Sequence, residues 1–288
     1  MVFLNGKFIP IGEAMVPVLD RGFIFGDGVY ELVPVYSRVP FRLDEHLARL
    51  DRSLAAVRIR NPYTRQQWRE IIRQLVLLQP HEDQGVYFQV TRGVAKRDHA
   101  FPQGVEPTVF IMSNPLVNPA RELVERGAEA LSATDYRWQK CDIKSISLIG
   151  NVLLRQLSAD AGAAETILFR DGRLTEASAS NVFIVRGGVI MGPPKSNLIL
   201  PGITYDVVLE LARAAGLPLE IRDLGEAQVR AADEIWVTSS SKEVLAIVRL
   251  DGKPVGEGRP GPVFKRMFEL YQDFKKTVMR TGKEKAAA

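Results

Sequence analysis

Strand and helix signals alternate along this chain of 288 residues, but in irregular order rather than in repeated strand–helix–strand units. The apolar stripe of residues 43–59 predicts an amphipathic helix, and residues 28–36 predict a strand whose Pro34 indicates a sheet edge or a bulge. The other predicted helices are residues 65–78, 119–127, 151–161, 204–215 and 263–278. The other predicted strands are residues 86–92, 107–112, 128–134, 165–169, 181–185, 234–238 and 246–250, with a hairpin at 3–9. This order favours an α+β fold of two α/β domains, with the active site at the domain interface.

The best candidate for a domain boundary is the turn-rich connector Asn114-Pro-Leu-Val-Asn-Pro119. It predicts a smaller N-terminal domain over residues 1–118. A larger C-terminal domain follows over residues 119–280. Residues 281–288 are expected to form a flexible tail.

The composition excludes several classes of protein. Hydrophobic residues make up 46% of the chain, which is enough for a sizeable core. No apolar stretch approaches the ~18–20 residues that span a bilayer, so we expect a soluble cytoplasmic protein without a membrane partner. Cys141 is the one cysteine, and an internal disulfide is therefore impossible.

The charge pattern argues against a nucleic-acid partner. The formal net charge is +4, and residues 273–288 hold five basic and two acidic residues, an excess of +3. The body of the chain is therefore nearly neutral, whereas a nucleic-acid surface is basic. The three histidines, His46, His81 and His99, have no second ligand at metal-binding spacing, so no metal site is expected.

One amine and one carboxylate suggest a particular cofactor chemistry. Lys144 lies in Lys140-Cys-Asp-Ile-Lys-Ser145, and Glu176 follows 32 residues later (176 − 144). An aldehyde cofactor such as pyridoxal phosphate needs an amine to form a Schiff base and a carboxylate to keep its pyridine nitrogen protonated. Taken alone, a solvated loop lysine and a turn-capping acid explain the same residues.

Groups suited to a phosphate occur in three further segments. Arg49 lies on the predicted helix 43–59, and a guanidinium fork matches a phosphate dianion. The turn Pro201-Gly-Ile-Thr204 opens a helix, so the amides of Ile203 and Thr204 form an anion site to which the Thr204 hydroxyl adds a donor. Ser240 follows a buried strand. The ordinary alternatives are a surface arginine, a helix N-cap and a polar turn.

Taken together, these segments resemble the fold-type IV pyridoxal-phosphate enzymes, and most closely their D-amino acid aminotransferase branch. The family also includes branched-chain aminotransferases and aminodeoxychorismate lyase. The resemblance covers roughly residues 1–275. It rests on the segments at residues 20–31, 45–50, 87–93, 140–145, 175–182, 201–204 and 237–240.

The resemblance implies a role for each candidate residue. Lys144 would be the Schiff-base lysine that moves the proton, and Glu176 would pair with the pyridine nitrogen. Arg49, Ile203, Thr204 and Ser240 would hold the phosphate of pyridoxal 5′-phosphate. Tyr30 would bind the substrate carboxylate with Arg97 and His99, which come from the neighbouring subunit in the bacillus-type enzymes and so imply a homodimer.

The resemblance therefore implies ping-pong transamination between D-amino acids, such as D-alanine and D-glutamate, and 2-oxo acids, such as 2-oxoglutarate and pyruvate. Another activity of the same fold is the first alternative: a branched-chain aminotransferase, an R-selective amine transaminase or an aminodeoxychorismate lyase. A binding or structural protein that kept the fold without catalysis is the second alternative. Pro34 and Ala179 depart from the close relatives, which leaves the side-chain preference open.

Overall fold

The computed structural model describes residues 1–282, which form two compact units. The first unit comprises Met1–Leu116, Ile143–Leu148 and the chain from Thr277, and the second comprises Val117–Asp142 and Ile149–Lys276. The segment that carries Lys144 therefore packs with the N-terminal part of the chain. The division at residues 118 and 119 stays a prediction, and residues 283–288 of the predicted tail lie outside the described residues.

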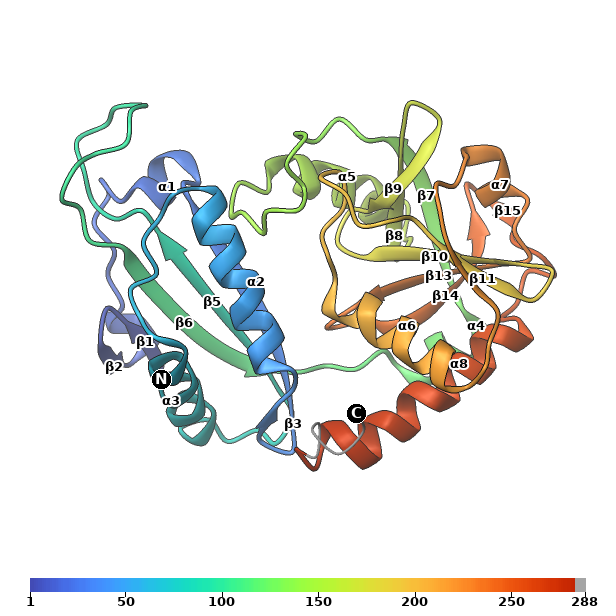
Figure 1. Cartoon of the computed structure of the whole chain (residues 1–288), viewed down its shortest axis with the longest axis horizontal. Coiled ribbons are helices and arrows are strands. Elements are labelled where there is room, and N and C mark those ends of the chain that lie inside the picture. Colours follow the sequence, from blue (N-terminus) through green and yellow to red (C-terminus); the bar gives the residue numbers. More distant parts are fainter. Residues whose placement is uncertain (283–288) are drawn as a thin grey trace. The chain divides into compact units, whose positions relative to one another are not determined.

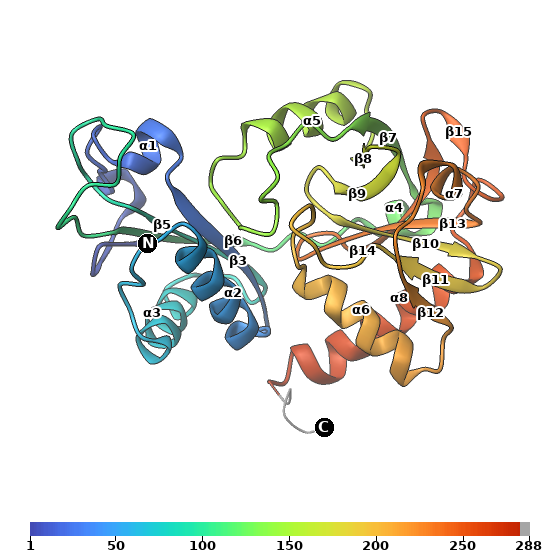
Figure 2. The same ribbon diagram turned by 45° about the horizontal axis from the view of Figure 1, so that its top comes forward.

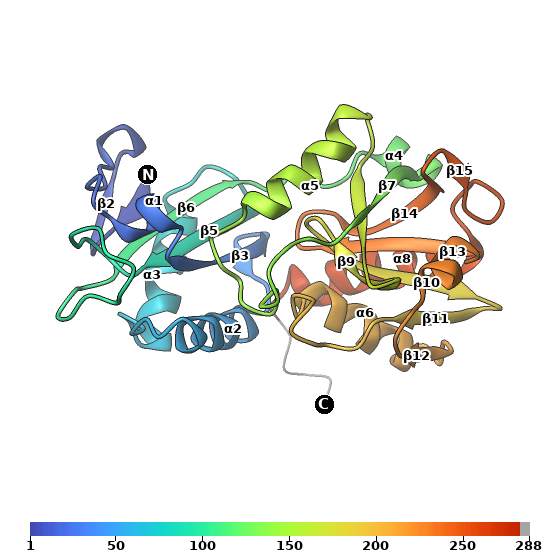
Figure 3. The ribbon, with the colours of Figure 1, turned by 90° about the horizontal axis from the view of Figure 1, so that it is seen from above.

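The first unit is a sheet with two helices on one face (Figure 1). The sheet has the strand order β2-β1-β6-β5-β3-β4. Its strands are β1 (Val2–Leu4), β2 (Lys7–Ile9), β3 (Gly28–Tyr36), β4 (Val39–Pro40), β5 (Gln84–Thr91) and β6 (Thr108–Pro115). The helices α2 (Leu43–Ala56) and α3 (Arg65–Leu77) bury their apolar stripes against it. Figure 3 shows both helices on the same side of the sheet. Short η1 (Ile11–Glu13) and α1 (Arg21–Phe25) precede β3.

The second unit is built on a mixed sheet with the order β12-β11-β10-β13-β14-β7-β8-β9, and β15 pairs with β14. β7 runs parallel to both β14 and β8, whereas β10, β13 and β14 are antiparallel neighbours. The strands are β7 (Ala128–Thr134), β8 (Glu165–Arg170), β9 (Arg173–Ala177), β10 (Asn181–Arg186), β11 (Val189–Gly192), β12 (Leu219–Ile221), β13 (Glu234–Ser239), β14 (Glu243–Leu250) and β15 (Lys253–Pro254).

Helices cover this second sheet. α6 (Ile203–Ala214) and α8 (Pro262–Phe274) lie beside each other and contact β13, and α5 (Ile149–Asp160) contacts β7 and β8 (Figure 2). The buried Glu234 carboxylate accepts the amides of Val263 and Phe264 at 2.9 and 2.7 Å, which stabilises the start of α8. The remaining helical segments are α4 (Arg121–Arg126), α7 (Glu226–Arg230) and the π-helical η2 (Lys275–Met279).

The sequence predicted most of these elements. Strands at 28–36 and 128–134 have the predicted bounds, and Thr64 caps α3 through a capping box with Gln67. Pro34 lies on β3, next to the edge strand β4, which pairs with Val35 and Tyr36 of β3. The prediction missed β9, which carries Glu176, and it began β14 three residues late. Among residues 1–282, no helix has both the length and the apolar character needed to cross a membrane.

Candidate functional site

Lys144 is held against β3 by backbone contacts within the first unit. The amide of Tyr30 donates to the Lys144 carbonyl at 2.8 Å, and the amide of Lys144 donates to Ser53 Oγ on α2 at 3.3 Å. The Lys144 Nζ lies 4.2 Å from the centroid of the Tyr30 ring. The structure therefore brings Lys144 and Tyr30, both predicted site residues, into contact. Because hydrogen bonds hold both the amide and the carbonyl of Lys144, the Cα of this lysine has a defined position.

Arg49 is buried rather than exposed, because its guanidinium pairs with Glu31. Arg49 Nε donates to Glu31 Oε1 and Nη2 donates to Oε2, both at 2.8 Å. Glu31 lies on β3, on the same buried face as Val29, Val33 and Val35. Although burial would raise the pKa of Glu31, the Arg49 guanidinium beside it lowers that pKa below its usual range. The two-point contact fixes the plane of the guanidinium.

His46 completes this buried cluster from the next turn of α2. Its Nδ1 lies 2.8 Å from Glu31 Oε2. Burial lowers the pKa of His46, opposed by Glu31 and reinforced by the positive Arg49 and Lys144. The ring is therefore neutral, and its proton belongs on Nδ1, which faces the ionised carboxylate. Its Nε2 is buried and has no hydrogen-bond partner among the described residues.

The segment that carries Arg97 and His99 is an exposed loop between β5 and β6. Both side chains lie on the ring of Phe25: the Arg97 guanidinium carbon is 5.2 Å from its centroid, and the His99 ring is 5.5 Å away. A hydrogen bond anchors the loop between these two residues: Arg21 Nη1 donates to the carbonyl of Asp98 at 2.5 Å. The structure thus places Arg97 and His99 together, over α1 of the same unit.

Glu176 belongs to the second unit, where it shares a guanidinium with another acid. Arg137 Nη1 donates to Glu176 Oε1 at 2.6 Å, while its Nε and Nη2 donate to the two oxygens of Asp135 at 2.9 Å. All three side chains are buried. Asp135 also accepts from Thr175 Oγ1 at 2.8 Å and forms an ion pair with Arg170, whose Nη2 lies 3.1 Å from Oδ1. Arg137 is thus divided between two carboxylates.

Burial shifts the pKa of Glu176 upward, whereas the pKa of the neighbouring Asp135 is lowered. Burial raises the pKa of Glu176 to about 7, even though Arg137 and the Leu200 amide favour the ionised form and Asp135 disfavours it. The pKa of Asp135 is lowered: burial opposes ionisation, but Arg137 and Thr175 more than compensate. A carboxyl group that titrates near neutrality can ionise when a cation such as a pyridinium approaches it.

The N-terminus of α6 lies beside Glu176. Glu176 Oε2 accepts from the Leu200 amide at 3.0 Å and from Asn181 Nδ2 at 3.3 Å, and Asn181 Nδ2 also donates to the Leu200 carbonyl at 3.0 Å. Gly202 is the N-cap of α6, and a Cβ at this position would collide with Asn181 Oδ1. Glycine is therefore required for this close approach, which brings the amides of Ile203 and Thr204 near the Glu176 segment.

Ser240 lies in the turn that joins β13 to β14. The turn is connected to the Glu176 segment through Glu165, a fully buried carboxylate at the start of β8. Lys242 Nζ donates to Glu165 Oε2 at 2.8 Å, and Ser180 Oγ donates to the same oxygen at 2.9 Å. The second unit thus groups Glu176, the α6 N-terminus and the Ser240 turn.

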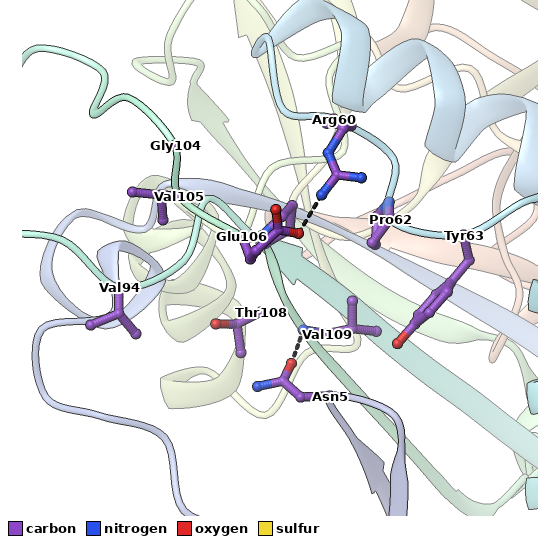
Figure 4. Close-up of a pocket in the computed structure, with 11 residues that line it drawn as sticks. Asn5, Arg60, Pro62, Tyr63, Val94, Gly104, Val105, Glu106, Thr108 and Val109 are labelled. Carbon is purple, nitrogen blue, oxygen red and sulfur yellow. Dashed lines mark hydrogen bonds and ion pairs between the residues drawn. The ribbon is translucent and has the colours of Figure 1, made fainter.

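Other features of the described residues lie apart from these groups. A cavity of about 590 Å³ in the first unit is bordered by Asn5, Arg60, Tyr63 and Glu106, and contains none of the predicted site residues (Figure 4). Burial raises the pKa of the Cys141 thiol to about 11, as befits a small packing residue. Residues 1–282 contain no group of three His, Cys, Asp or Glu side chains arranged to hold a metal ion.

The sequence interpretation missed the partners that fix the predicted residues. Glu31 had a visible signal, since it is a charged residue on the apolar face of a strand and must have a partner there. His46 falls three residues before Arg49, one turn away on the same helix face. Arg137 and Glu165 gave a weaker signal, because their partners lie 39 and 77 residues away in the sequence.

Sequence comparison relates the chain to aminotransferases. A family model described as amino-transferase class IV matches residues 28–250. The chain is 39% identical over 272 residues to a D-alanine aminotransferase of Bacillus licheniformis, with 94% of this chain and 96% of that protein covered. It is 37% identical over 274 residues to a D-alanine aminotransferase of Staphylococcus aureus (strain MW2), covering 95% and 97% of the two chains.

Solved structures of similar fold include two branched-chain amino acid aminotransferases. A T.th. enzyme with pyridoxamine 5′-phosphate gives a TM-score of 0.89 at 26% identity, covering 94% of this chain and 92% of that one. The enzyme of Thermoproteus uzoniensis with norvaline gives a TM-score of 0.88 at 26% identity, covering 99% and 95%. The family match over most of the chain, the full-length relatives and the shared α+β fold lead to one conclusion: this chain belongs to the class IV aminotransferases.

Proposed function

We propose that this protein is a D-amino acid aminotransferase that moves an amino group from D-alanine or a similar donor to 2-oxoglutarate, in a ping-pong cycle. The observation that carries the proposal is 39% identity to a D-alanine aminotransferase over 94% of the chain. The similar branched-chain enzymes share the fold at 26% identity. Fold alone does not specify the substrate, so the higher sequence identity decides between them.

The residues fit pyridoxal 5′-phosphate as the cofactor. Glu176 offers a carboxyl group with a pKa of about 7 for the ring nitrogen. The Ile203 and Thr204 amides, the Arg49 guanidinium and the Ser240 hydroxyl would bind the phosphate, since unsatisfied helix amides and a fixed guanidinium are suitable anion donors. When bound, pyridoxal phosphate supplies an aldehyde carbon and a ring that accepts electrons from the substrate Cα.

Lys144 is the proposed proton carrier. Its Nζ would first hold the cofactor, then remove the proton from the substrate Cα and return it during transfer of the amino group. The Tyr30 ring beneath the Nζ, at 4.2 Å, limits the positions that the amine can take.

Tyr30, Arg97 and His99 are the proposed donors to the substrate carboxylate. Arg97 and His99 are exposed and already adjacent on Phe25, which suits a loop that completes a site in a second copy. We therefore propose a homodimer.

Apolar side chains on one helix also support a homodimer, because an exposed apolar stripe marks an interaction surface. These side chains on α5 are Ile149, Val152, Leu153 and Leu157. We also propose a cytoplasmic location.

A donor screen tests the function. Purified protein with pyridoxal phosphate is incubated with each enantiomer of alanine and leucine plus 2-oxoglutarate, and the 2-oxo acid products are measured. D-alanine should be converted and L-alanine should not. Turnover of L-leucine without turnover of D-alanine would instead establish the branched-chain activity, which the fold similarity favours as the second candidate.

Two variants separate the remaining alternatives. Arg97→Met should reduce kcat/KM for D-alanine by on the order of 30-fold or more, because truncating one partner of a buried charge pair costs about 2–5 kcal/mol. An unchanged rate, with a carboxylate-free amine as the best donor, would favour an amine transaminase.

Lys144→Ala should abolish the visible absorbance of lysine-bound pyridoxal phosphate. Wild-type protein that binds no cofactor would favour a non-catalytic binding protein.

A further inference from the structure

The hairpin turn between β13 and β14 consists of three polar residues. Ser239 pairs with Glu243, so Ser240, Ser241 and Lys242 form a three-residue turn. Such a turn closes on its own backbone pairing and does not need a lysine. A hairpin tip is by default one of the more mobile parts of a fold. This tip is tethered by its last residue, Lys242.

The tether ends on a deeply buried carboxylate. Lys242 Nζ donates to Glu165 Oε2 at 2.8 Å, while Glu165 is fully buried and Lys242 is 22% exposed. The Lys242 side chain therefore points from the exposed turn toward the interior, and it loses side-chain entropy relative to a lysine that extends into solvent. Burial alone would raise the pKa of Glu165, but Lys242 and the hydroxyl donors lower it. The pair is ionised, and its geometry is restricted on both sides.

Glu165 also holds the segment that follows Glu176. Its oxygens accept from Ser178 Oγ and from Ser180 Oγ, the latter at 2.9 Å. The Ala177 amide donates to the Ser180 carbonyl at 2.7 Å, which closes this segment into a tight turn next to Glu176. One carboxylate thus links the Ser240 turn to the Glu176 segment. The two segments are far apart in sequence, at residues 176–180 and 239–242.

We propose that Lys242 is a positioning residue, which acts through Glu165 to set the place of the Ser240 hydroxyl relative to Glu176 and so strengthens binding of the cofactor phosphate. The inference rests on the proposed function, in which Ser240 meets the phosphate and Glu176 meets the ring. A hydroxyl that is held in place loses less entropy when it binds an anion than one on a free turn. Lys242 itself need not touch the cofactor.

The test compares two ligands that differ by the phosphate group. Apoprotein is titrated with pyridoxal phosphate and with pyridoxal, and dissociation constants are measured by tryptophan fluorescence. Lys242→Gln, which keeps most of the aliphatic stem, should weaken pyridoxal phosphate binding on the order of tenfold, the size typical of losing an outer partner. Pyridoxal binding should change by less than about twofold, and Lys242→Arg should restore most of the loss because it keeps the charge. Lys253→Gln, at an exposed position on β15, is the matched control.

The outcomes separate the two proposals. Wild-type apoprotein that binds no pyridoxal phosphate overturns the proposed function itself. The positioning role alone is overturned if the wild type binds pyridoxal phosphate normally and Lys242→Gln weakens the binding of both ligands equally. It is also overturned if Lys242→Gln weakens the binding of neither ligand. Should Lys242→Gln fail to fold, as judged by its thermal midpoint, Ser180→Ala is the second variant: it removes the Ser180 bonds to Glu165 and to Lys242 and keeps the ion pair between them. In Ser180→Ala, pyridoxal phosphate binding should again weaken more than pyridoxal binding, by a smaller factor than in Lys242→Gln, and equal losses for the two ligands would again exclude the role.

Discussion

The two units each bury an arginine beside a glutamate, yet the pKa values of the two glutamates shift in opposite directions. In the first unit, Glu31 receives two bonds from Arg49 and one contact from His46, and its pKa is lowered. In the second unit, Glu176 receives one bond from Arg137, which gives its other donors to Asp135, and its pKa is raised to about 7. Burial raises the pKa of both carboxyl groups, but Arg49 gives two bonds to Glu31 and outweighs burial there, whereas Arg137 gives one bond to Glu176 and does not.

The comparison assigns different tasks to the two acids. Glu31 is a permanent counter-ion that keeps a buried arginine in one orientation. Glu176 is poised to lose its proton when a positive charge arrives, which suits a carboxylate that meets a ring nitrogen. A buried ion pair contributes little net stability but costs much when half of it is removed. The units should therefore respond unequally to loss of their arginines.

The largest effect is expected from Arg49→Met in the first unit. It leaves the buried Glu31 carboxylate without its cation, and breaking a buried pair in this way costs about 3–5 kcal/mol. The free energy of unfolding of the apoprotein in urea measures the loss. Arg73→Met removes an exposed arginine paired with Glu70 and should cost far less, because solvent screens an exposed ion pair. Equal losses in the two variants would show that the Glu31 pair has no special weight.

A smaller effect is expected from Arg137→Met in the second unit. Asp135 keeps Arg170 and Thr175 as partners, and Glu176 can remain protonated, so the loss should be about 1–3 kcal/mol. Urea unfolding at pH 7.5 gives the value, and the loss should shrink at pH 5.5, at which Glu176 already carries its proton. Arg173→Met, in the exposed pair with Asp223, is the control. A loss as large as that of Arg49→Met would contradict the proposed difference between the units.

The sequence predicted the elements and the charged residues better than it predicted their pairing. Periodicity is local, so the strand 28–36 and the helices 43–59 and 65–78 were recognised, with the first helix ending three residues early, at residue 56. The assignment of the chain to its family is confirmed by the match over residues 28–250. The roles of the individual site residues stay predictions.

The missed features depend on contacts between distant segments. The strand β9 forms because it pairs with β8, and nothing in Arg173–Ala177 alone distinguishes it from a turn. Arg137 reads as one charge among several in a basic loop until Glu176 is placed next to it. The pKa of about 7 for Glu176 follows from burial and from the shared arginine, neither of which is visible in the order of residues. Burial of Glu31, in contrast, was visible in the alternation of its strand.

The last variant, Glu176→Gln, is expected to gain rather than lose stability, and it sharpens the comparison through pH. The pKa of the Glu176 carboxyl group rises from about 4.5 in the unfolded chain to about 7 in the folded protein, so the folded protein binds this proton more tightly. The contribution of this group to stability is therefore complete below pH 4.5 and is lost as the pH rises through 7. The wild-type apoprotein should therefore lose thermal stability between pH 5 and pH 8, and Glu176→Gln should flatten that slope and be more stable by about 1–3 kcal/mol at pH 8. Glu220→Gln, an exposed acid beside Arg222, should leave the slope as it is in the wild type. A Glu176→Gln slope equal to that of the wild type would mean that Glu176 is already ionised at pH 5, and that the two buried glutamates carry the same charge after all.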